Sequence, residues 1–417
     1  METISEALTL KEQGKLSEAV QKLKDYVSEA DEAEQFDIAQ LLHEWGLLND
    51  AKEVYEDILI LNPGDHYVKL MLSEIHTDLG NDQEVIDLLE DIEPEDEAYI
   101  PALVQMADLY QSQGLFEVAE QKLLEAKDLD TDEPIIDLAL AELAFSNAEY
   151  LKAIPFYQRI EKYDEDLDVV DIKERLAEAL SAVGKWEEAL SYYEKIKIES
   201  PDQMFKYGYT AFQLSRYQVA MNTWNELIEL DPDYTSVYPL LAHAYDQEGA
   251  PQEAFDITVR GISKDEHNHE LYYNAAMYAF TISREADAID YLKQAIAIDP
   301  SYEDAVEQLV RIYQEKNQFE DAKELVDSLI QYEGYPPVYN FYLATINEEL
   351  ENFNEASIHY SKAYESFKED PEFLRSYGFF LIEEGKTTNA IEVLTKYVNV
   401  RPEDEEVNEY LERMHSE

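Results

Sequence analysis

Small apolar residues recur along the chain at a nearly constant interval. Two clear examples are Ala119 and Ala189. They end segments of the form Gly-x-aromatic-x-x-Ala at residues 114–119 and 184–189. Eight of the eleven intervals between members of this ladder are 34 residues long, and the others are 31, 32 and 36. The ladder consists of Ala19, Ala51, Val85, Ala119, Ala153, Ala189, Ala220, Ala254, Ala288, Ala322, Ala356 and Ala390. This period predicts one structural unit that recurs twelve times over residues 1–402.

Two further positions keep the register of the ladder. Twelve residues before each member lies a second small residue, with Val310 as the single larger exception. Four residues after each member lies a bulky apolar residue, except in unit eight, where Thr258 takes its place. A spacing of four returns to the same helix face, so the ladder residue and its bulky neighbour should both point into the core. The pattern predicts two closely packed helices in every unit.

Glycine and proline mark the ends of the predicted helices. Glycine readily adopts the left-handed conformation that ends many helices, and proline blocks helix continuation. Seven glycines separate the two helices of a unit, namely Gly14, Gly46, Gly80, Gly114, Gly184, Gly249 and Gly385. Five prolines are expected to end second helices, namely Pro63, Pro201, Pro232, Pro300 and Pro402.

With these small, bulky, glycine and proline positions in register, the chain resembles the tetratricopeptide repeat. The resemblance implies an all-α, right-handed superhelical solenoid of about twelve antiparallel helix pairs, whose first helices line a concave groove that binds peptides or protein segments. We expect residues 1–402 to form one continuous array and residues 403–417 to form a polar C-terminal capping helix. In composition, the chain is also similar to acidic cytosolic tetratricopeptide proteins of Gram-positive bacteria.

The net charge of the chain argues against some classes of binding partner. The 93 acidic and 32 basic side chains give a formal net charge of −61, which should repel nucleic acid and anionic membranes. Hydrophobic residues make up 45% of the chain, enough for a packed core. The chain has no cysteine, no run long enough to span a bilayer and no signal-like start, so we expect a cytoplasmic protein without direct membrane insertion.

Motifs for catalysis or for a metal are not expected. The stretch 128–132 has the first ligand spacings of a calcium loop, but Glu133 replaces the required glycine and Ala139 replaces the bidentate glutamate. His267 and His269 lie in a predicted loop between repeats, without a further ligand at helical spacing. Phosphate-binding and nucleophile motifs are missing as well, so we expect no enzyme and no cofactor.

The family geometry implies that positions 2, 5, 6, 9, 12 and 13 of each unit face the groove. In the C-terminal half these positions are rich in aromatic residues, whereas those of units six and ten are mostly charged. The candidate peptide-binding residues are Phe205, Tyr209, Tyr273, Asn274, Phe341, Tyr342, Arg375 and Phe379. Aromatic rings with few cations nearby favour a protein or peptide segment that carries apolar anchors and positive charge.

Two interpretations of these rings stay open. They contact a bound segment, or they pack against the first helix of the next repeat. Phe205 and Phe341, at position five, are the preferred ligand contacts. A receptor for chaperone tails is not expected, because Asn274 matches the middle asparagine of that clamp while Asp304 and Gln308 replace its lysine and arginine.

The pattern therefore favours a protein-binding scaffold or assembly factor. The alternative is a self-associating structural protein whose groove accepts helices of another copy. One further expectation concerns unit eight, where Thr258 and Gly261 interrupt the core pattern. Glycine within a helix costs about 1 kcal/mol relative to alanine, so residues 251–265 are either a hinge, which Gly261→Ala would stabilise, or a gap that nearby side chains fill.

Overall fold

Every regular element that the structure describes is an α-helix. The computed structural model describes residues 2–162 and 171–416, which hold 25 helices and no strand. The chain divides into two compact units, Met1–Ile198 and Glu199–Glu417. None of the described helices is both long and apolar enough to cross a membrane. The predicted all-α class is confirmed, whereas one continuous array over residues 1–402 stays a prediction.

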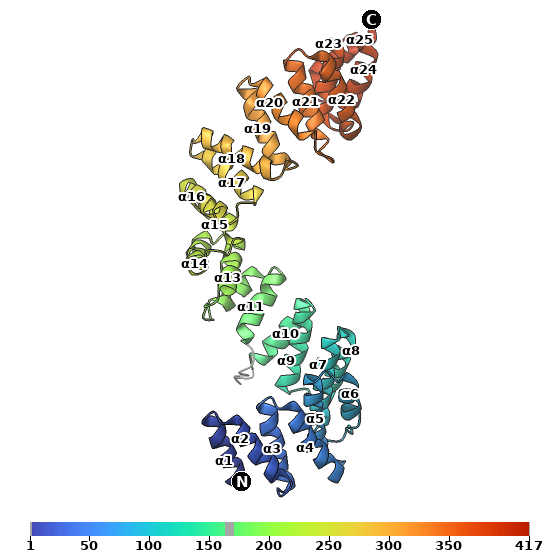
Figure 1. Cartoon of the computed structure of the whole chain (residues 1–417). Coiled ribbons are helices and arrows are strands. Elements are labelled where there is room, and N and C mark those ends of the chain that lie inside the picture. The colour runs from blue at the N-terminus through green and yellow to red at the C-terminus, as the bar shows by residue number, and fades with distance from the viewer. Residues whose placement is uncertain (1, 163–170, 417) are drawn as a thin grey trace. The chain divides into compact units, whose positions relative to one another are not determined.

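The described part of the first unit consists of six helix pairs (Figure 1). Its helices are α1 (Glu2–Glu12), α2 (Leu16–Val27), α3 (Glu32–Glu44), α4 (Leu48–Leu61), α5 (His66–Asp78), α6 (Asp82–Glu90), α7 (Tyr99–Ser112), α8 (Phe116–Leu129), α9 (Pro134–Ser146), α10 (Tyr150–Ile160), α11 (Ile172–Ala182) and α12 (Trp186–Tyr193). The two helices of a pair pack along each other, and the second helix then contacts the first helix of the next pair, as α4 contacts α5. This stacking of helix pairs is a solenoid.

The second unit repeats this arrangement with six pairs and one further helix (Figure 1). Its helices are α13 (Pro201–Gln213), α14 (Tyr217–Leu230), α15 (Val237–Gln247), α16 (Pro251–Ile262), α17 (His269–Thr281), α18 (Glu285–Ile298), α19 (Glu303–Glu315), α20 (Phe319–Leu329), α21 (Val338–Glu349), α22 (Phe353–Phe367), α23 (Pro371–Glu383), α24 (Thr387–Val400) and α25 (Glu405–Ser416). The helix α25 is the predicted capping helix. Its Val407 is fully buried against the last pair.

The predicted core positions are buried in all twelve units. Each of the twelve ladder residues has 0% of its surface exposed. The bulky residues four positions later are buried as well, including Trp224 and Tyr360 at 0%. Gly208 and Gly378 show why the second small position is needed, because a Cβ atom there would lie 2.3 Å from Trp224 and Leu394, respectively. The small residue of the first helix thus makes room for the bulky residue of the second.

The turn between the two helices is left-handed in every unit. The seven predicted glycines have φ between 70° and 77°. The other five units place a different residue at the same turn with φ between 56° and 61°, namely Ala148, Ser215, Ser283, Asn317 and Glu351. The turn geometry therefore belongs to the repeat and does not depend on glycine.

Proline ends four second helices as predicted, but Pro201 has another role. Pro63, Pro232, Pro300 and Pro402 each follow the last residue of a second helix by two positions. The helix α12 already ends at Tyr193, and Pro201 is the first residue of α13. Proline suits the first helical position because its missing N–H would have no partner within the helix.

The structure leaves no empty space at Gly261. A Cβ atom at Gly261 would lie 2.8 Å from Cβ of Tyr238, so the glycine allows α16 to approach α15 closely. Thr258 is fully buried, and its hydroxyl donates a hydrogen bond of 2.8 Å to the carbonyl of Ala254. Alanine at position 261 would therefore meet its neighbour instead of filling space. Nearby side chains thus fill this place, and the hinge over residues 251–265 stays a prediction.

Candidate functional site

The first helices of the repeats carry the residues that the sequence assigns to ligand binding. The surface formed by the first helices of the pairs is called the first-helix face below. The eight candidates lie on α13, α17, α21 and α23, and every one of them is half-buried. Each side chain thus has one part packed within the protein and another part at the surface.

The candidates on α13 and α17 contact aromatic rings that begin the following repeat. The ring of Phe205 lies 5.3 Å from that of Tyr234 and stacks at 6.1 Å on Tyr209. Tyr273 meets Tyr302 edge to face, with ring centroids 5.4 Å apart. Burial is the main cause that raises the pKa of Tyr302 to about 12, and the carboxylate of Asp304 adds to it. Tyr234 and Tyr302 are therefore neutral at physiological pH.

The candidates on α21 follow the same arrangement. Phe341 packs edge to face against the buried ring of Phe373 on α23, with centroids 5.2 Å apart. It also lies 6.2 Å from Phe367. Tyr342 stacks on the fully buried Tyr339 at 6.3 Å, and burial raises the pKa of Tyr342. Phe341 therefore forms part of the packing between the last two helix pairs.

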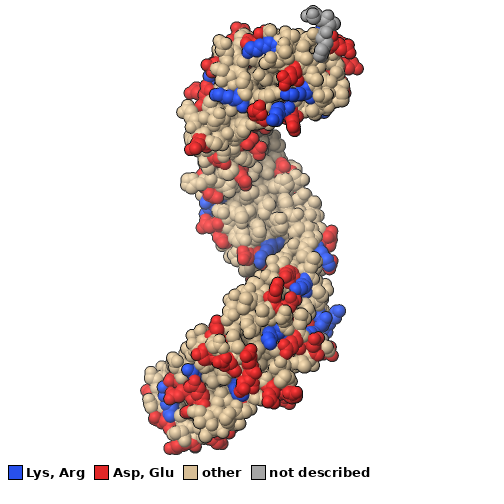
Figure 2. Space-filling view, turned by 90° about the vertical axis from the view of Figure 1, so that its right-hand side faces the viewer, with Lys and Arg blue, Asp and Glu red and all other residues tan. Residues whose placement is uncertain are grey.

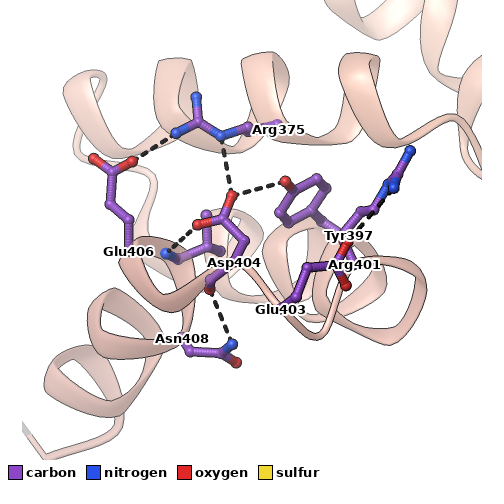
Figure 3. Close-up of polar contacts among 8 residues, drawn as sticks. Arg375, Tyr397, Arg401, Glu403, Asp404, Glu406 and Asn408 are labelled. Atoms are coloured by element: carbon purple, nitrogen blue, oxygen red, sulfur yellow. Dashed lines mark hydrogen bonds and ion pairs between the residues drawn. The ribbon is translucent and has the colours of Figure 1, made fainter.

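Arg375 and Phe379 both contact the C-terminal end of the second unit, and Figure 3 shows the ion pairs of Arg375. The guanidinium of Arg375 reaches Asp404 at 3.4 Å and Glu406 at 2.7 Å, and it lies 4.9 Å from the ring centroid of Phe379. Phe379 meets Tyr410 of α25 edge to face. These contacts join α23 to α25, so both residues have a structural role at the end of the second unit.

The structure thus brings together the two candidates on α13 and the two on α23, and it connects Phe205, Tyr273 and Phe341 to the next repeat. Phe205 stacks on Tyr209, and Arg375 lies over Phe379. Contacts between repeats use other residues, such as Tyr302 and Phe373. Packing against the next repeat is therefore observed, while ligand contact by the eight candidates stays a prediction.

A hollow on the first-helix face of the first unit was not singled out from the sequence. It lies between α5 and α7, has a volume of about 760 Å³ and includes the loop residues 96–98 in its wall. Tyr67, Met71 and Glu74 of α5 face Pro101 and Gln105 of α7 across it. The side chain of Tyr67 is 58% exposed, which is unusual for a large ring beside a hollow.

A second hollow continues the first toward α3. It has a volume of about 490 Å³ and is lined by Phe36 and Asp37 of α3. Both hollows share Asp65 and Tyr67. The rings of Phe36 and Tyr67 lie 5.5 Å apart. The two hollows form one groove across α3, α5 and α7, which is called the α3–α5–α7 groove below.

A short polar network fixes one carboxylate in this groove. The amide nitrogen of Gln105 donates a hydrogen bond of 3.0 Å to Oε1 of Glu74, and Ser73 Oγ lies at hydrogen-bond distance from Gln105 Oε1. Burial raises the pKa of Glu74, and the charge of nearby His43 opposes this effect. A carboxylate held by a neutral amide in a partly desolvated wall is stabilised by an added cation.

The repeat register would have revealed the α3–α5–α7 groove. Phe36 occupies position five of unit two, Tyr67 and Met71 occupy positions two and six of unit three, and Pro101 occupies position two of unit four. These are among the positions that identified the candidates in the C-terminal half. What the register could not show is which rings the following repeat covers and which it leaves exposed.

The charged and metal-ligating side chains near the groove limit which ligands it can bind. On the face drawn in Figure 2, red carboxylates occur in larger groups than the blue lysine and arginine side chains. The linings of both hollows contain carboxylates but neither lysine nor arginine. Among residues 2–162 and 171–416, no group of three histidine, aspartate or glutamate side chains is placed to hold a metal ion. The groove can therefore offer apolar area and negative charge.

Comparisons with families and curated proteins agree on the repeat. Residues 337–404 match the model of YpiA-like C-terminal tetratricopeptide repeats, and residues 111–165 match that of YpiA-like tetratricopeptide repeats. General tetratricopeptide models match residues 174–202 and 283–338. The TPR repeat-containing protein YpiA of Bacillus subtilis (strain 168) is 35% identical over 416 residues, which cover 99% of this chain and 98% of that protein.

More distant proteins share parts of the chain. The DnaJ homolog subfamily C member 7 homolog of Dictyostelium discoideum is 23% identical over 50% of this chain and 42% of its own length. Among solved structures, YrrB, a TPR protein with an unusual peptide-binding site, is 19% identical with a TM-score of 0.39 and covers 45% of this chain and 96% of its own. Naa15/Naa10 bound to HypK-THB has a TM-score of 0.41 at 16% identity, covering 92% of this chain and 65% of its own.

Proposed function

The chain belongs to the YpiA-like family of tetratricopeptide-repeat proteins, and on that premise we propose that it is a non-catalytic scaffold that binds segments of other proteins along its first-helix face. The observation that carries the proposal is the α3–α5–α7 groove, which combines an exposed ring, Tyr67, with a lining that has carboxylates and no lysine or arginine. Exposed aromatic area is frequent at binding surfaces, and the carboxylates of the lining add negative charge to it.

The chemistry of this surface favours a particular class of partner. The net charge of −61 attracts basic segments and repels nucleic acid and anionic membranes. We propose a cytoplasmic protein or peptide partner that carries positive charge together with apolar anchors. In the second unit, the half-buried Phe205, Tyr209, Tyr273, Asn274, Phe341 and Tyr342 are proposed as additional contacts on the first helices of that unit.

Affinity capture tests the proposed function. The tagged full-length chain would be incubated at low salt with native cytosol of its source, and the bound proteins would be identified by mass spectrometry. We expect a reproducible set of proteins that is lost when Tyr67 and Phe36 are both changed to alanine. Recovery of nothing above the level of an untagged control would contradict the proposal.

Self-association is the second candidate, and exposed aliphatic side chains favour it. Ile60, Leu61 and Leu151 on second helices are 74%, 78% and 71% exposed, respectively. Such side chains are stabilised when another copy covers them. Light scattering across a range of protein concentrations would separate the two candidates. A mass that stays at the 48.3 kDa of the monomer would exclude self-association.

A further inference from the structure

The lining of the α3–α5–α7 groove is rich in negative charge. Six carboxylates line it, and the sole basic side chain of its lining is His66, which lies 2.7 Å from Asp96. The nearby cation Lys69 is buried and pairs with Asp91, outside the groove. The carboxylates in the groove are therefore not balanced by a lysine or arginine of the lining.

Two of the other five carboxylates have structural tasks within the protein. Asp65 accepts a hydrogen bond from the backbone N–H of Val68 and caps α5. Asp96 accepts a bond of 2.8 Å from the backbone N–H of Ala98. The contact of Glu74 with the neutral amide of Gln105 leaves a carboxylate whose charge is poorly compensated on the groove wall. Glu74 is half-buried, so a cation that pairs with it is screened less by water than one beside an exposed carboxylate.

An apolar surface lies next to that carboxylate. Tyr67 and Met71 are on the same helix as Glu74, seven and three residues before it, respectively. Pro101 faces them from α7. Tyr67 and Pro101 are exposed, and Met71 is half-buried. An apolar side chain that covers Tyr67 removes aromatic area from water, which contributes favourable free energy in proportion to that area.

We propose that the α3–α5–α7 groove binds an extended basic segment of a partner protein, with an arginine or lysine paired to Glu74 and an adjacent apolar side chain packed on Tyr67 and Met71. The inference rests on the proposed function and assigns it a place and a ligand chemistry. An arginine fits best, because its planar guanidinium can bind a carboxylate through two hydrogen bonds. Alternation of charged and apolar contacts suits an extended segment, whose successive side chains point in opposite directions.

Other occupants fit this groove less well. Phosphate-bearing ligands would meet six carboxylates and no lysine or arginine in the lining. A metal ion would need a cluster of ligands, which the residues described by the structure do not form. A second copy of the chain would bring a surface of the same negative sign, given the net charge of −61. Charge complementarity thus selects a basic partner.

Methionine-methyl NMR gives a test that reads the groove directly. The full chain would be labelled with 13C at the methyl groups of its 7 methionines. It would be titrated with a short glycine–serine peptide that carries two leucine–arginine pairs, and with a matched peptide that has citrulline in place of arginine. We expect the Met71 resonance to shift with the arginine peptide, while that of Met277 on α17 stays in place. The citrulline peptide should bind at least tenfold more weakly.

Two variants and a matched control complete the test. Glu74→Gln and Tyr67→Ala should each weaken binding of the arginine peptide at least tenfold while the circular dichroism spectrum is kept. Glu307→Gln removes an exposed carboxylate from α19, a first helix of the second unit, and should leave the affinity unchanged. An unmoved Met71 resonance, or equal affinities for the two peptides, would overturn the inference.

Failure of this inference and failure of the proposed function give different results. If the peptide shifts Met204 or Met277 instead of Met71, binding occurs in the second unit and only the assigned groove is wrong. If the Glu74→Gln and Tyr67→Ala variants capture the same proteins as the wild type, the scaffold function stands without this groove. If the wild-type chain captures no protein, the proposed function fails independently of the peptide result.

Discussion

Five of the twelve turns inside the repeats place a residue other than glycine in the left-handed region. For residues with a side chain this conformation costs about 1–2 kcal/mol, while glycine adopts it freely. Asn317 tolerates it best among the five, because its short polar side chain can form local hydrogen bonds. Ala148 has no such compensation, at a φ of 57°. Individual repeats thus differ in stability although they share one backbone.

Ala148→Gly should stabilise the protein by about 0.5–1 kcal/mol, because relief of the left-handed strain exceeds the added entropy of the unfolded chain. Gly114→Ala, at the same turn of the preceding repeat with a φ of 75°, is the matched control and should destabilise it. Urea unfolding followed by circular dichroism measures both. Equal midpoints for Ala148→Gly and wild type would show that this turn carries no strain.

Gly261→Ala should destabilise the protein by about 1–3 kcal/mol, although alanine has the higher helix propensity by about 1 kcal/mol. The reason is the 2.8 Å approach that a new Cβ would make to Cβ of Tyr238. Thermal unfolding would measure the effect, and Gly261→Ser should be at least as damaging. A higher melting temperature for Gly261→Ala would mean that space exists between α15 and α16 after all.

His359 gives a pH dependence at the residue scale. Its side chain is 6% exposed, and Nδ1 lies 3.0 Å from Oδ1 of Asn340. Burial lowers the pKa of His359, and Lys362 and Lys323 act in the same direction, whereas Asp327 and Glu355 oppose it. Below the unfolded pKa of about 6.5, the unfolded state therefore binds the proton more readily than the folded state. The contribution of neutral His359 to the free energy of unfolding is therefore full above that pH. It is lost as the pH falls toward the pKa of His359 in the folded state.

His359→Gln should consequently lose less stability than wild type when the pH is lowered from about 7.5 to 5.5, by at most about 1.4 kcal/mol per pH unit. The exposed His267 provides the control, since His267→Gln should follow the wild-type profile. Urea unfolding at both pH values supplies the comparison. Parallel pH profiles for His359→Gln and wild type would contradict the assigned cause.

At the scale of the elements, first and second helices begin in different ways. Loops between repeats supply side-chain caps to first helices, as Asp31, Asp65 and Ser200 do for α3, α5 and α13. The second helices follow directly from the left-handed turn, without a side-chain cap at α4, α8 or α14. The acidic stretch at residues 128–132 runs from the end of α8 into such a loop, where Asp130 accepts a hydrogen bond from the N–H of Asp132. Many aspartates between repeats thus have a local structural cause.

The capping helix is the element whose removal should have the clearest local effect. Val407→Ser places a hydroxyl in a fully buried site of α25 and should release this helix from α23 and α24. Hydrogen exchange of the amides in α25 should become faster, while that of α13 stays unchanged. Val400→Ser, at a site 49% exposed, serves as control. Unchanged protection of α25 in Val407→Ser would show that the ion pairs of Arg375 suffice to hold it.

The sequence predicted the helix pairs well, because each unit repeats the same local contacts. The ladder alanines and residues such as Trp224 and Tyr360 are buried as their spacing implies. The candidate site was harder to predict, since exposure of a ring depends on the next repeat. Phe373 covers Phe341, whereas the loop at residues 91–98 leads into α7 and leaves Tyr67 exposed beside a hollow. Such loop geometry has no signature in a single repeat.

At the scale of the whole molecule, the protein combines a repetitive helical framework with a strongly acidic surface. The framework supplies rows of first-helix side chains at constant spacing, and the net charge of −61 decides which segments those rows can attract. The central proposal is that the first-helix face contacts another polypeptide.

Photo-cross-linking in living cells tests that claim most directly. The photoreactive residue benzoylphenylalanine would replace Tyr67 on α5, Tyr209 on α13 or, as control, Ile358 on the second helix α22, which is 51% exposed. On illumination, we expect a protein other than this chain to become cross-linked at both first-helix positions, with little cross-linking at position 358. Adducts that form equally at all three positions, or only with other copies of this chain, would contradict it.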